Sequence, residues 1–159
     1  MGQRPSAFVI PSGDGKALRG PAGGPSTIKA GTSDTNGSFA ALEVVIGPSQ
    51  GPPLHSHLRE DEMWYIIDGE FRFIAGDTVL PAHTGAFVFV PRTTPHCFQN
   101  LGVSPGRILV MFTPSGMERF FEEHAALPEG PVDPDSYRAI SERNWMTVEG
   151  PPLAELRPT

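Results

Sequence analysis

The sequence predicts an all-β protein of one domain with a short helical appendix at its C-terminal end. The 159 residues are the length of a single domain. Glycine and proline number 18 each, which favours short strands and tight turns over long helices. Short apolar runs separated by turn residues recur through the middle of the chain, as they do in an antiparallel sandwich or barrel.

Residues 1–38 are expected to form an N-terminal arm and the first strands. Residues 11–26, PSGDGKALRGPAGGPS, are rich in glycine and proline, and we expect them to be irregular. The next four residues, TIKA, fit a short strand. The run FAALEVVI at residues 39–46 predicts a stronger strand, because its apolar residues alternate in a way that buries one face.

Residues 39–114 are expected to form the barrel core. Further strand-like runs cover residues 63–67, 71–74, 78–80, 86–90, 96–99 and 107–113. Turn residues such as Asp68-Gly69 and Gly76-Asp77 lie between them. No internal repeat of fixed period divides this region, so it is interpreted as one core.

Residues 115–159 are expected to hold helices and a tail packed on the same domain. Ser115 is followed three residues later by Glu118, a spacing that predicts a capping box before an amphipathic helix. A second helix is expected from about residue 133. The tail at residues 150–159, GPPLAELRPT, is too rich in proline for regular structure.

Charge and cysteine content exclude several classes of function. The net charge of −6 leaves no basic patch for a phosphate backbone, so we expect no binding to nucleic acid. The apolar run in the N-terminal region is too short for a signal peptide or a membrane span. Cys97 is the single cysteine, which excludes an internal disulfide. These features predict a cytoplasmic protein that does not bind membranes.

Four residues carry the chemistry expected of a metal site. His55 and His57 lie one residue apart, so strand alternation turns both side chains to one face and Ser56 to the other. Glu62 follows after a turn, and His96 lies on a later strand. Three neutral imidazoles and one carboxylate suit Fe, Mn, Ni, Cu or Zn rather than Ca²⁺.

The motifs around these residues resemble those of the cupin superfamily. The segment GPPLHSHLREDEMWYIIDG is similar to the first cupin motif, with matches at Gly51, His55, His57, Glu62 and Gly69. The second motif is matched at Gly85, Pro91, His96 and Asn100, and Thr93 stands where the motif has a glycine. The resemblance implies a double-stranded β-helix, or jelly roll, in which the three histidines and Glu62 bind one divalent transition metal.

The resemblance extends to bacterial monocupins similar to quercetin dioxygenases. It rests on the order of features in residues 27–73 and on GMERFFEE after the last expected strand. It implies an oxygen-dependent dioxygenase acting on a small aromatic or polyketide/flavonol-like substrate. Glu62 would then leave the metal and accept a proton from a substrate hydroxyl. Small cupins commonly form homodimers, and the long N-terminal arm is compatible with one.

Two other functions fit the same residues. A metal-dependent isomerase or lyase would act on a hydroxylated substrate without O₂. A non-catalytic cupin would use its metal to anchor a small-molecule ligand. Oxygen uptake separates the dioxygenase from both.

Apolar residues near the expected metal site are candidates for a substrate pocket. Trp64 and Ile66 share strand parity with Glu62, so we expect them to line the same cavity. Phe73 and Phe98 are expected to add to it. The same pattern is also typical of a plain barrel core. Which of Val88 and Phe89 faces inward stays open.

Other polar residues near the motifs are assigned structural positions. Glu60 and Asp61 are expected to be solvated in a turn. Cys97 has the opposite parity to His96, and we interpret it as a small packed residue rather than a nucleophile. Asn100 shares the parity of His96 and could orient a ligand or cap a turn, and we favour the structural role.

Overall fold

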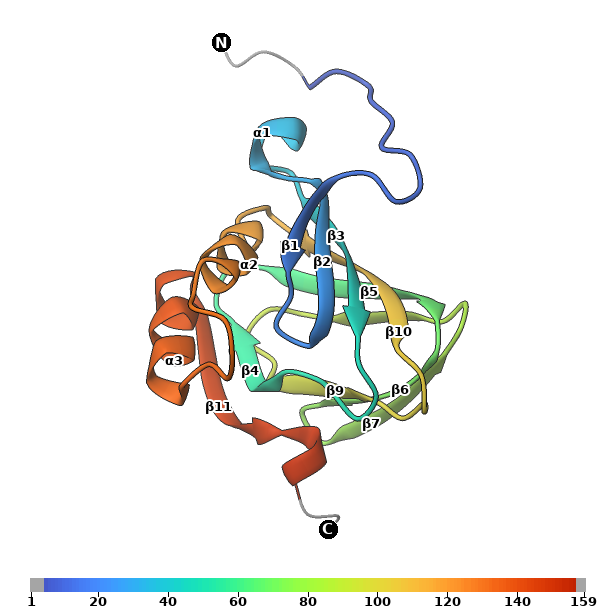
Figure 1. Ribbon diagram of the computed structural model, residues 1–159, viewed down its shortest axis with the longest axis vertical. Helices are drawn as coiled ribbons and strands as arrows, with labels where there is room; N and C mark the ends of the chain where they lie inside the picture. The colour runs from blue at the N-terminus through green and yellow to red at the C-terminus, as the bar shows by residue number, and fades with distance from the viewer. Residues whose placement is uncertain (1–4, 157–159) are drawn as a thin grey trace.

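The computed structural model describes residues 5–156 and shows two antiparallel sheets enclosing one core (Figure 1). The larger sheet has the order β1 (Lys16–Arg19), β2 (Gly23–Ala30), β3 (Ala40–Ile46), β10 (Gly106–Thr113), β5 (Asp61–Asp68) and β8 (Phe87–Val90). The smaller sheet has the order β11 (Met146–Pro152), β4 (Pro53–His57), β9 (His96–Asn100), β6 (Glu70–Ala75) and β7 (Thr78–His83). The prediction of an all-β double-stranded β-helix is confirmed.

Strand alternation builds the core between the sheets. On β3, Leu42, Val44 and Ile46 are buried, and Glu43 between them is only partly covered. Burying each of these aliphatic side chains stabilises the folded protein by roughly 1.5–3 kcal/mol relative to leaving it exposed. On β8 the inward residue is Val88, at 7% exposure, and Phe89 faces outward at 52%.

Helices cover one side of the barrel, beside β4 and β11 (Figure 1). They are α2 (Glu118–Ala125) and α3 (Pro134–Arg143), with a short α1 (Thr32–Thr35) and a 3₁₀ turn at Leu153–Glu155 elsewhere. The prediction of a helix starting near residue 133 is confirmed, because the Asp133 carboxylate accepts a hydrogen bond from the Ser136 amide at 3.0 Å. No helix in the described part of the chain is long and apolar enough to cross a membrane.

The predicted capping box at α2 is wrong. The helix begins at Glu118, with Met117 before it, and Ser115 is not the cap. The Glu118 carboxylate instead accepts the amides of Gly116 at 2.8 Å and Thr32 at 2.7 Å. Thr32 and Glu118 are 86 residues apart in the sequence, so this hydrogen bond links α1 to the start of α2.

Two segments predicted to be irregular form edge strands. Residues 16–19 pair with β2 as β1, and the tail segment through Pro152 pairs with β4 as β11. The ladder of β11 is regular from Met146 to Val148 and shifts register before Pro152. Proline is tolerated there because β11 lies at the edge of its sheet, where one side of the strand needs no ladder hydrogen bonds.

Candidate metal centre

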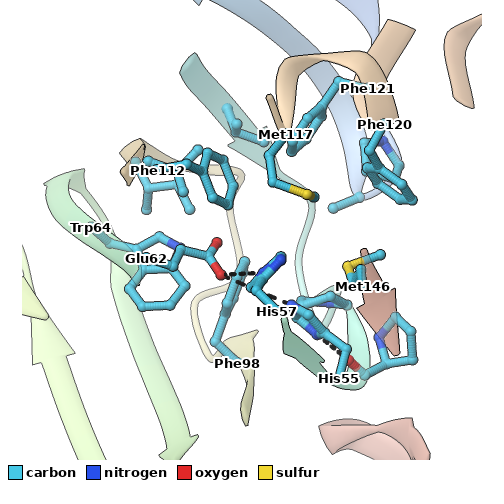
Figure 2. Close-up of a pocket in the computed structure, with 18 of the residues that line it drawn as sticks. His55, His57, Glu62, Trp64, Phe98, Phe112, Met117, Phe120, Phe121 and Met146 are labelled. Carbon is cyan, nitrogen blue, oxygen red and sulfur yellow. Dashed lines mark hydrogen bonds and ion pairs between the residues drawn. The ribbon is translucent and has the colours of Figure 1, made fainter. Parts of the chain in front are cut away.

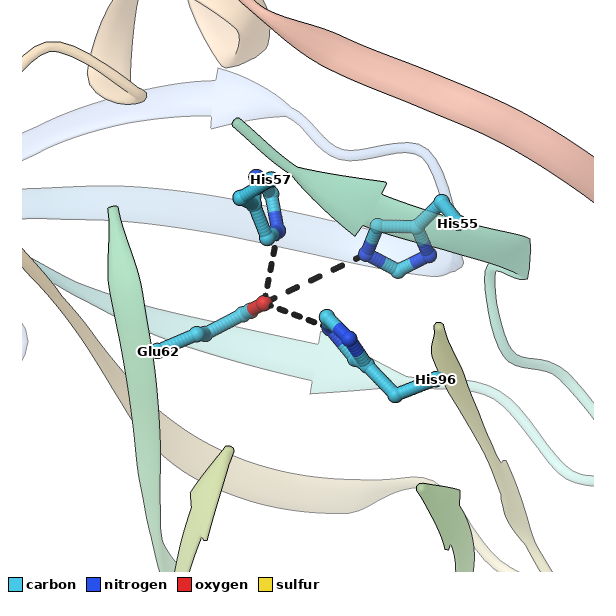
Figure 3. A group of neighbouring side chains, drawn as sticks. All are labelled: His55, His57, Glu62 and His96. Carbon is cyan, nitrogen blue, oxygen red and sulfur yellow. Dashed lines mark hydrogen bonds and ion pairs between the residues drawn. The ribbon is translucent and has the colours of Figure 1, made fainter. Parts of the chain in front are cut away.

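The four predicted metal ligands lie together between the two sheets. His55 and His57 come from β4 and His96 from the adjacent strand β9, while Glu62 reaches across from β5 of the larger sheet (Figure 3). All four residues are buried, and one ligand atom from each lies within 4.8 Å of the others. The sequence placed His55 and His57 on one strand and Glu62 and His96 on two later ones, and the fold brings all four to one point.

One carboxylate oxygen is the centre of this cluster. Oε2 of Glu62 lies 2.7 Å from Nε2 of His57, 2.8 Å from Nε2 of His96 and 4.0 Å from Nε2 of His55. The contact between Nε2 of His57 and Oε2 of Glu62 lacks the directional geometry of a hydrogen bond. Three imidazole nitrogens thus crowd a single oxygen, as ligands of a shared cation do.

Backbone carbonyls fix the tautomers of two rings. Nδ1 of His55 lies 2.7 Å from the Pro53 carbonyl, and Nδ1 of His96 lies 2.8 Å from the Thr94 carbonyl. A carbonyl only accepts, so each Nδ1 donates its hydrogen and each neutral ring keeps its lone pair on Nε2. Those lone pairs face the Glu62 carboxylate. Electron pairs this close need a cation among them, either a proton or a metal ion.

The charges of the cluster also suit a cation. Burial lowers the pKa of His55 well below its ordinary value, and the neighbouring rings of His96 and His57 lower it further. Burial opposes ionisation of Glu62, but His57 and His96 hold its pKa well below the ordinary value. Burial lowers the pKa of His96, yet Glu62 raises it overall. The site therefore combines an ionised Glu62 carboxylate with a neutral His55 imidazole, while the carboxylate stabilises positive charge at His96.

The donor set fits a divalent transition metal. Three imidazole nitrogens and one carboxylate oxygen are ligands that Fe, Mn, Ni, Cu and Zn accept, whereas Ca²⁺ prefers six to eight oxygens. The Nδ1 contacts of His55 and His96 are the outer hydrogen bonds that commonly orient metal-binding histidines. The buried cluster is thus compatible with one metal ion.

The loop that carries His96 is held close to β4 by the backbone. The Thr93 amide donates to the His57 carbonyl at 2.8 Å. Thr93, which replaces the motif glycine, adopts a φ of 68°. This left-handed conformation is unfavourable for a β-branched residue.

Gly51 lets the chain before β4 lie directly against the backbone of β9. A Cβ at this position would lie 1.8 Å from the Phe98 carbonyl oxygen.

An apolar cavity of about 90 Å³ opens beside the cluster. Trp64 and Phe98, which the sequence placed in a substrate pocket, line it together with His55, His57 and Glu62. Ile66 and Phe73 are fully buried but lie outside this lining, in the core. The Phe73 ring lies 5.1 Å from the rings of both Trp64 and Phe98, so it supports the pocket wall from behind.

The opposite wall of the cavity was not predicted from the sequence. Met117, just before α2, and Phe120 and Phe121 of α2 face the histidines across the cavity, as Figure 2 shows. Their spacing of three and four residues is that of one helix face, a signal from which the wall could have been inferred. Met146 of β11 and Tyr137 of α3 complete this wall.

Tyr137 brings a hydroxyl group to an otherwise apolar wall. Burial raises the pKa of Tyr137, and the negative charge of Glu62 raises it further. The phenol therefore stays protonated and can donate a hydrogen bond. Its ring packs edge-on against Phe120 at 5.5 Å, which fixes its position.

The expectation that Glu60 is solvated is wrong. Glu60 is 1% exposed, whereas Asp61 lies at the surface beside Arg92, at 3.0 Å. Burial raises the pKa of Glu60, although His57 and Arg59 oppose the shift.

The other two structural assignments are confirmed. Cys97 is fully buried, and the 3₁₀ turn at residues 153–155 packs against its strand. Asn100 holds a turn, donating to the carbonyls of Ile46 at 3.0 Å and Ser104 at 2.9 Å and accepting from the Gly102 amide at 2.8 Å.

Comparison with known proteins identifies one family. Residues 42–112 match the cupin domain. A stretch of 67 residues is 27% identical to an uncharacterized protein of Methanocaldococcus jannaschii, covering 42% of this chain. That match spans 54% of the relative, so it concerns about half of its length.

Solved structures share the fold. KdgF from Halomonas sp. superposes with a TM-score of 0.61 at 18% identity, covering 69% of this chain and 94% of that one. An RmlC-like cupin from Shewanella frigidimarina has a TM-score of 0.61 at 16% identity, covering 73% and 98%. A predicted oxalate decarboxylase from Thermotoga maritima has a TM-score of 0.57 at 22% identity, covering 67% and 99%. With the matched domain, the two-sheet barrel and both motifs in place, residues 42–112 of this chain are similar to the cupin domain, and the chain has the cupin fold.

Proposed function

We propose that this cupin binds one divalent transition metal through His55, His57, Glu62 and His96 and is an oxygen-dependent dioxygenase. One observation carries the proposal: three imidazoles and one carboxylate converge within 4.8 Å at the wall of an apolar cavity. A metal bound there would supply Lewis acidity and a route for electrons between substrate and O₂. Both atoms of O₂ would enter the product, so the reaction needs no external reductant.

Glu62 is the group proposed to move a proton. Its carboxylate is ionised and lies at the cavity wall, where it can accept a proton from a substrate hydroxyl. The substrate anion formed in this way is more easily oxidised than the neutral hydroxyl compound. The surrounding aromatic rings limit the entry of water, so the proton passes between Glu62 and the substrate rather than to bulk solvent.

The size of the cavity limits the substrate. About 90 Å³ is small beside the roughly 300–1,000 Å³ of typical small-molecule sites. A single aromatic ring or a compact enol matches this space, whereas a three-ring flavonol would require α2 to move. We therefore favour a small hydroxylated aromatic substrate over a flavonol.

A second candidate function is a metal-dependent lyase or isomerase. The Tyr137 hydroxyl favours it, because a protonated phenol opposite an ionised Glu62 forms a potential acid and base pair across one cavity. Such a pair could move a proton between two substrate positions without O₂.

The test begins with elemental analysis of the untagged protein purified without chelators, beside His96→Ala. Near-stoichiometric Fe, Mn, Ni or Cu that is lost in the variant supports the metal site. Oxygen uptake with catechol-like single-ring compounds then supports the dioxygenase, and it should exceed uptake with flavonols. Anaerobic conversion that Tyr137→Phe abolishes would favour the lyase or isomerase instead. A protein that takes up no metal would overturn the proposal.

A further inference from the structure

Three buried polar atoms at the metal centre have no hydrogen-bond partner among the described residues. Nε2 of His57 is one of them and faces the Glu62 carboxylate, and the other two are Nδ1 of His57 and Oε2 of Glu60. The Glu60 side chain is completely buried, and only its other oxygen, Oε1, is bonded, by the Arg59 guanidinium at 3.3 Å. A buried polar group left without a partner destabilises a protein by about 1–3 kcal/mol.

Nδ1 of His57 and Oε2 of Glu60 have complementary chemistry. For His57 to bind a metal through Nε2, which faces Glu62, its Nδ1 must carry the hydrogen. His55 and His96 donate that hydrogen to backbone carbonyls, but Nδ1 of His57 has no carbonyl within reach. His57 thus holds a donor that lacks an acceptor. Oε2 of Glu60 is an acceptor that lacks a donor.

The surroundings of Glu60 direct its free oxygen. Arg59 holds Oε1, and the Arg59 guanidinium itself lies over the ring of Trp145, 5.3 Å from its centroid. The Leu58 amide donates to the Trp145 carbonyl at 2.8 Å, which fixes this loop against the C-terminal segment. With Oε1 held in this way, Oε2 remains available for a partner. Glu60 lies three residues after His57, in the short loop between β4 and β5, and its side chain points into the interior.

We propose that Glu60 is a positioning residue for the metal ligand His57, with Oε2 accepting the Nδ1 hydrogen through one buried water. This inference rests on the proposed metal site. The link would fix the tautomer and orientation of the one ligand ring that lacks a backbone acceptor. It would also increase the electron density that Nε2 offers to a metal.

The test is the affinity for Zn(II), measured by competition with a chromophoric chelator in Glu60→Gln. Arg59 will hold the amide oxygen at the Oε1 position, which leaves an amide nitrogen, a donor, where Oε2 was. We expect affinity to fall about 10- to 100-fold, the range typical of outer hydrogen bonds to metal ligands. The matched control is Asp61→Asn, which removes the same charge one residue away at the surface and should change affinity less than about 3-fold.

A second measurement tests the wild-type protein first, so its main result does not depend on the folding of a variant. In the Zn(II)-loaded wild-type protein, the imidazole N–H signals of the three ligand histidines can be assigned by NMR. The inference predicts a slowly exchanging Nδ1–H of His57, which Glu60→Gln makes exchange fast. Equal Zn(II) affinity in Glu60→Gln and Asp61→Asn, or a fast-exchanging His57 proton in the wild type, would overturn it. Failure of the wild type to bind Zn(II) at all would overturn the metal site itself.

Discussion

His55 and His96 face each other across the β4–β9 ladder, with their ring centroids 4.3 Å apart. Each ring is held by a carbonyl two residues before it in the sequence. Both rings are therefore oriented by the backbone just before them, on β4 for His55 and in the loop before β9 for His96. A metal arriving at the site would need little rearrangement of these two ligands, which lowers the entropic cost of binding.

Removing one of these ligands should abolish tight metal binding. We expect His96→Ala to reduce metal affinity by more than about 100-fold, a larger loss than that of an outer hydrogen bond. The added metal should then no longer raise the melting temperature, because binding to the native state no longer stabilises it. Isothermal titration and thermal melts measure the two effects.

The matched control is His83→Ala. His83 is a histidine of the same barrel whose side chain is 68% exposed. Its removal should leave affinity and thermal shift unchanged. Equal losses in both variants would contradict the assigned site.

Gly51 is predicted to be irreplaceable. In Gly51→Ala the new methyl would lie 1.8 Å from the Phe98 carbonyl oxygen, a backbone atom that cannot move away without separating β4 from β9. We expect a loss of at least about 3 kcal/mol in unfolding free energy. Urea denaturation measures it, with Gly76→Ala as control, since a methyl at Gly76 meets no atom within 4 Å. A loss in Gly51→Ala no larger than in the control would refute the prediction.

Cys97 should be chemically inert in the folded protein. Burial raises the pKa of Cys97 to about 11, so almost no thiolate is present at neutral pH. We expect no reaction with a thiol reagent such as DTNB in native buffer, and one equivalent of reaction after denaturation. Rapid labelling of the native protein at pH 7 would contradict the prediction, because it would show that β9 opens and exposes Cys97.

His124 should weaken the fold at acidic pH. Burial lowers the pKa of His124, Arg19 lowers it further, and its Nδ1 has no hydrogen-bond partner in the described chain. The unfolded chain therefore binds this proton more readily than the folded protein. Stability is at its full value above about pH 6.5, the ordinary histidine value, and falls as pH drops toward the lowered folded value.

The test compares His124→Phe with the wild type in urea at pH 8 and pH 5.5. The variant keeps an aromatic ring against Phe120 and Tyr137, which lie 6.2 Å from His124 between ring centroids. Between pH 8 and pH 5.5 the unfolding free energy of His124→Phe should fall less than that of the wild type. The difference is at most about 1.4 kcal/mol per pH unit, the value for one proton. Identical pH profiles would assign the acid sensitivity to other groups.

The outer face of the larger sheet should be a contact between two copies of this chain. Tyr65, Phe87 and Phe89 are 45%, 60% and 52% exposed, and Tyr65 pairs with Phe87 across β5 and the free edge strand β8. The charged groups that border them, Asp61 and Arg92, neutralise each other. Two chains that each carry a net charge of −6 can therefore meet at this face without bringing unpaired like charges together.

Light scattering tests this homodimer. The double change Phe87→Ser with Phe89→Ser should shift the mass from dimer to monomer at micromolar concentration. Val79→Ser on β7, which removes an exposed apolar residue of the other sheet, should leave the mass unchanged. A monomeric wild type would refute the contact.

Local patterns in the sequence were sufficient to predict the barrel and its metal ligands. Alternation along β4 turns His55 and His57 to the same side, and motif spacing places Glu62 and His96 on two later strands, β5 and β9. The start of α3 followed from Asp133, because a helix cap depends on a few adjacent residues. These features depend on periodicity within one strand or turn, which a sequence shows directly.

Only the tertiary structure decided what surrounds the site. Glu60 is buried although its loop is polar, because the Gly116 turn lies beside its carboxylate and its partner Arg59 packs on Trp145. Tyr137 reaches the cavity because α3 packs beside β11, which itself forms only when the proline-rich tail finds the free edge of β4. Burial by segments distant in the chain is a sum over many weak contacts, and no short stretch of sequence records it.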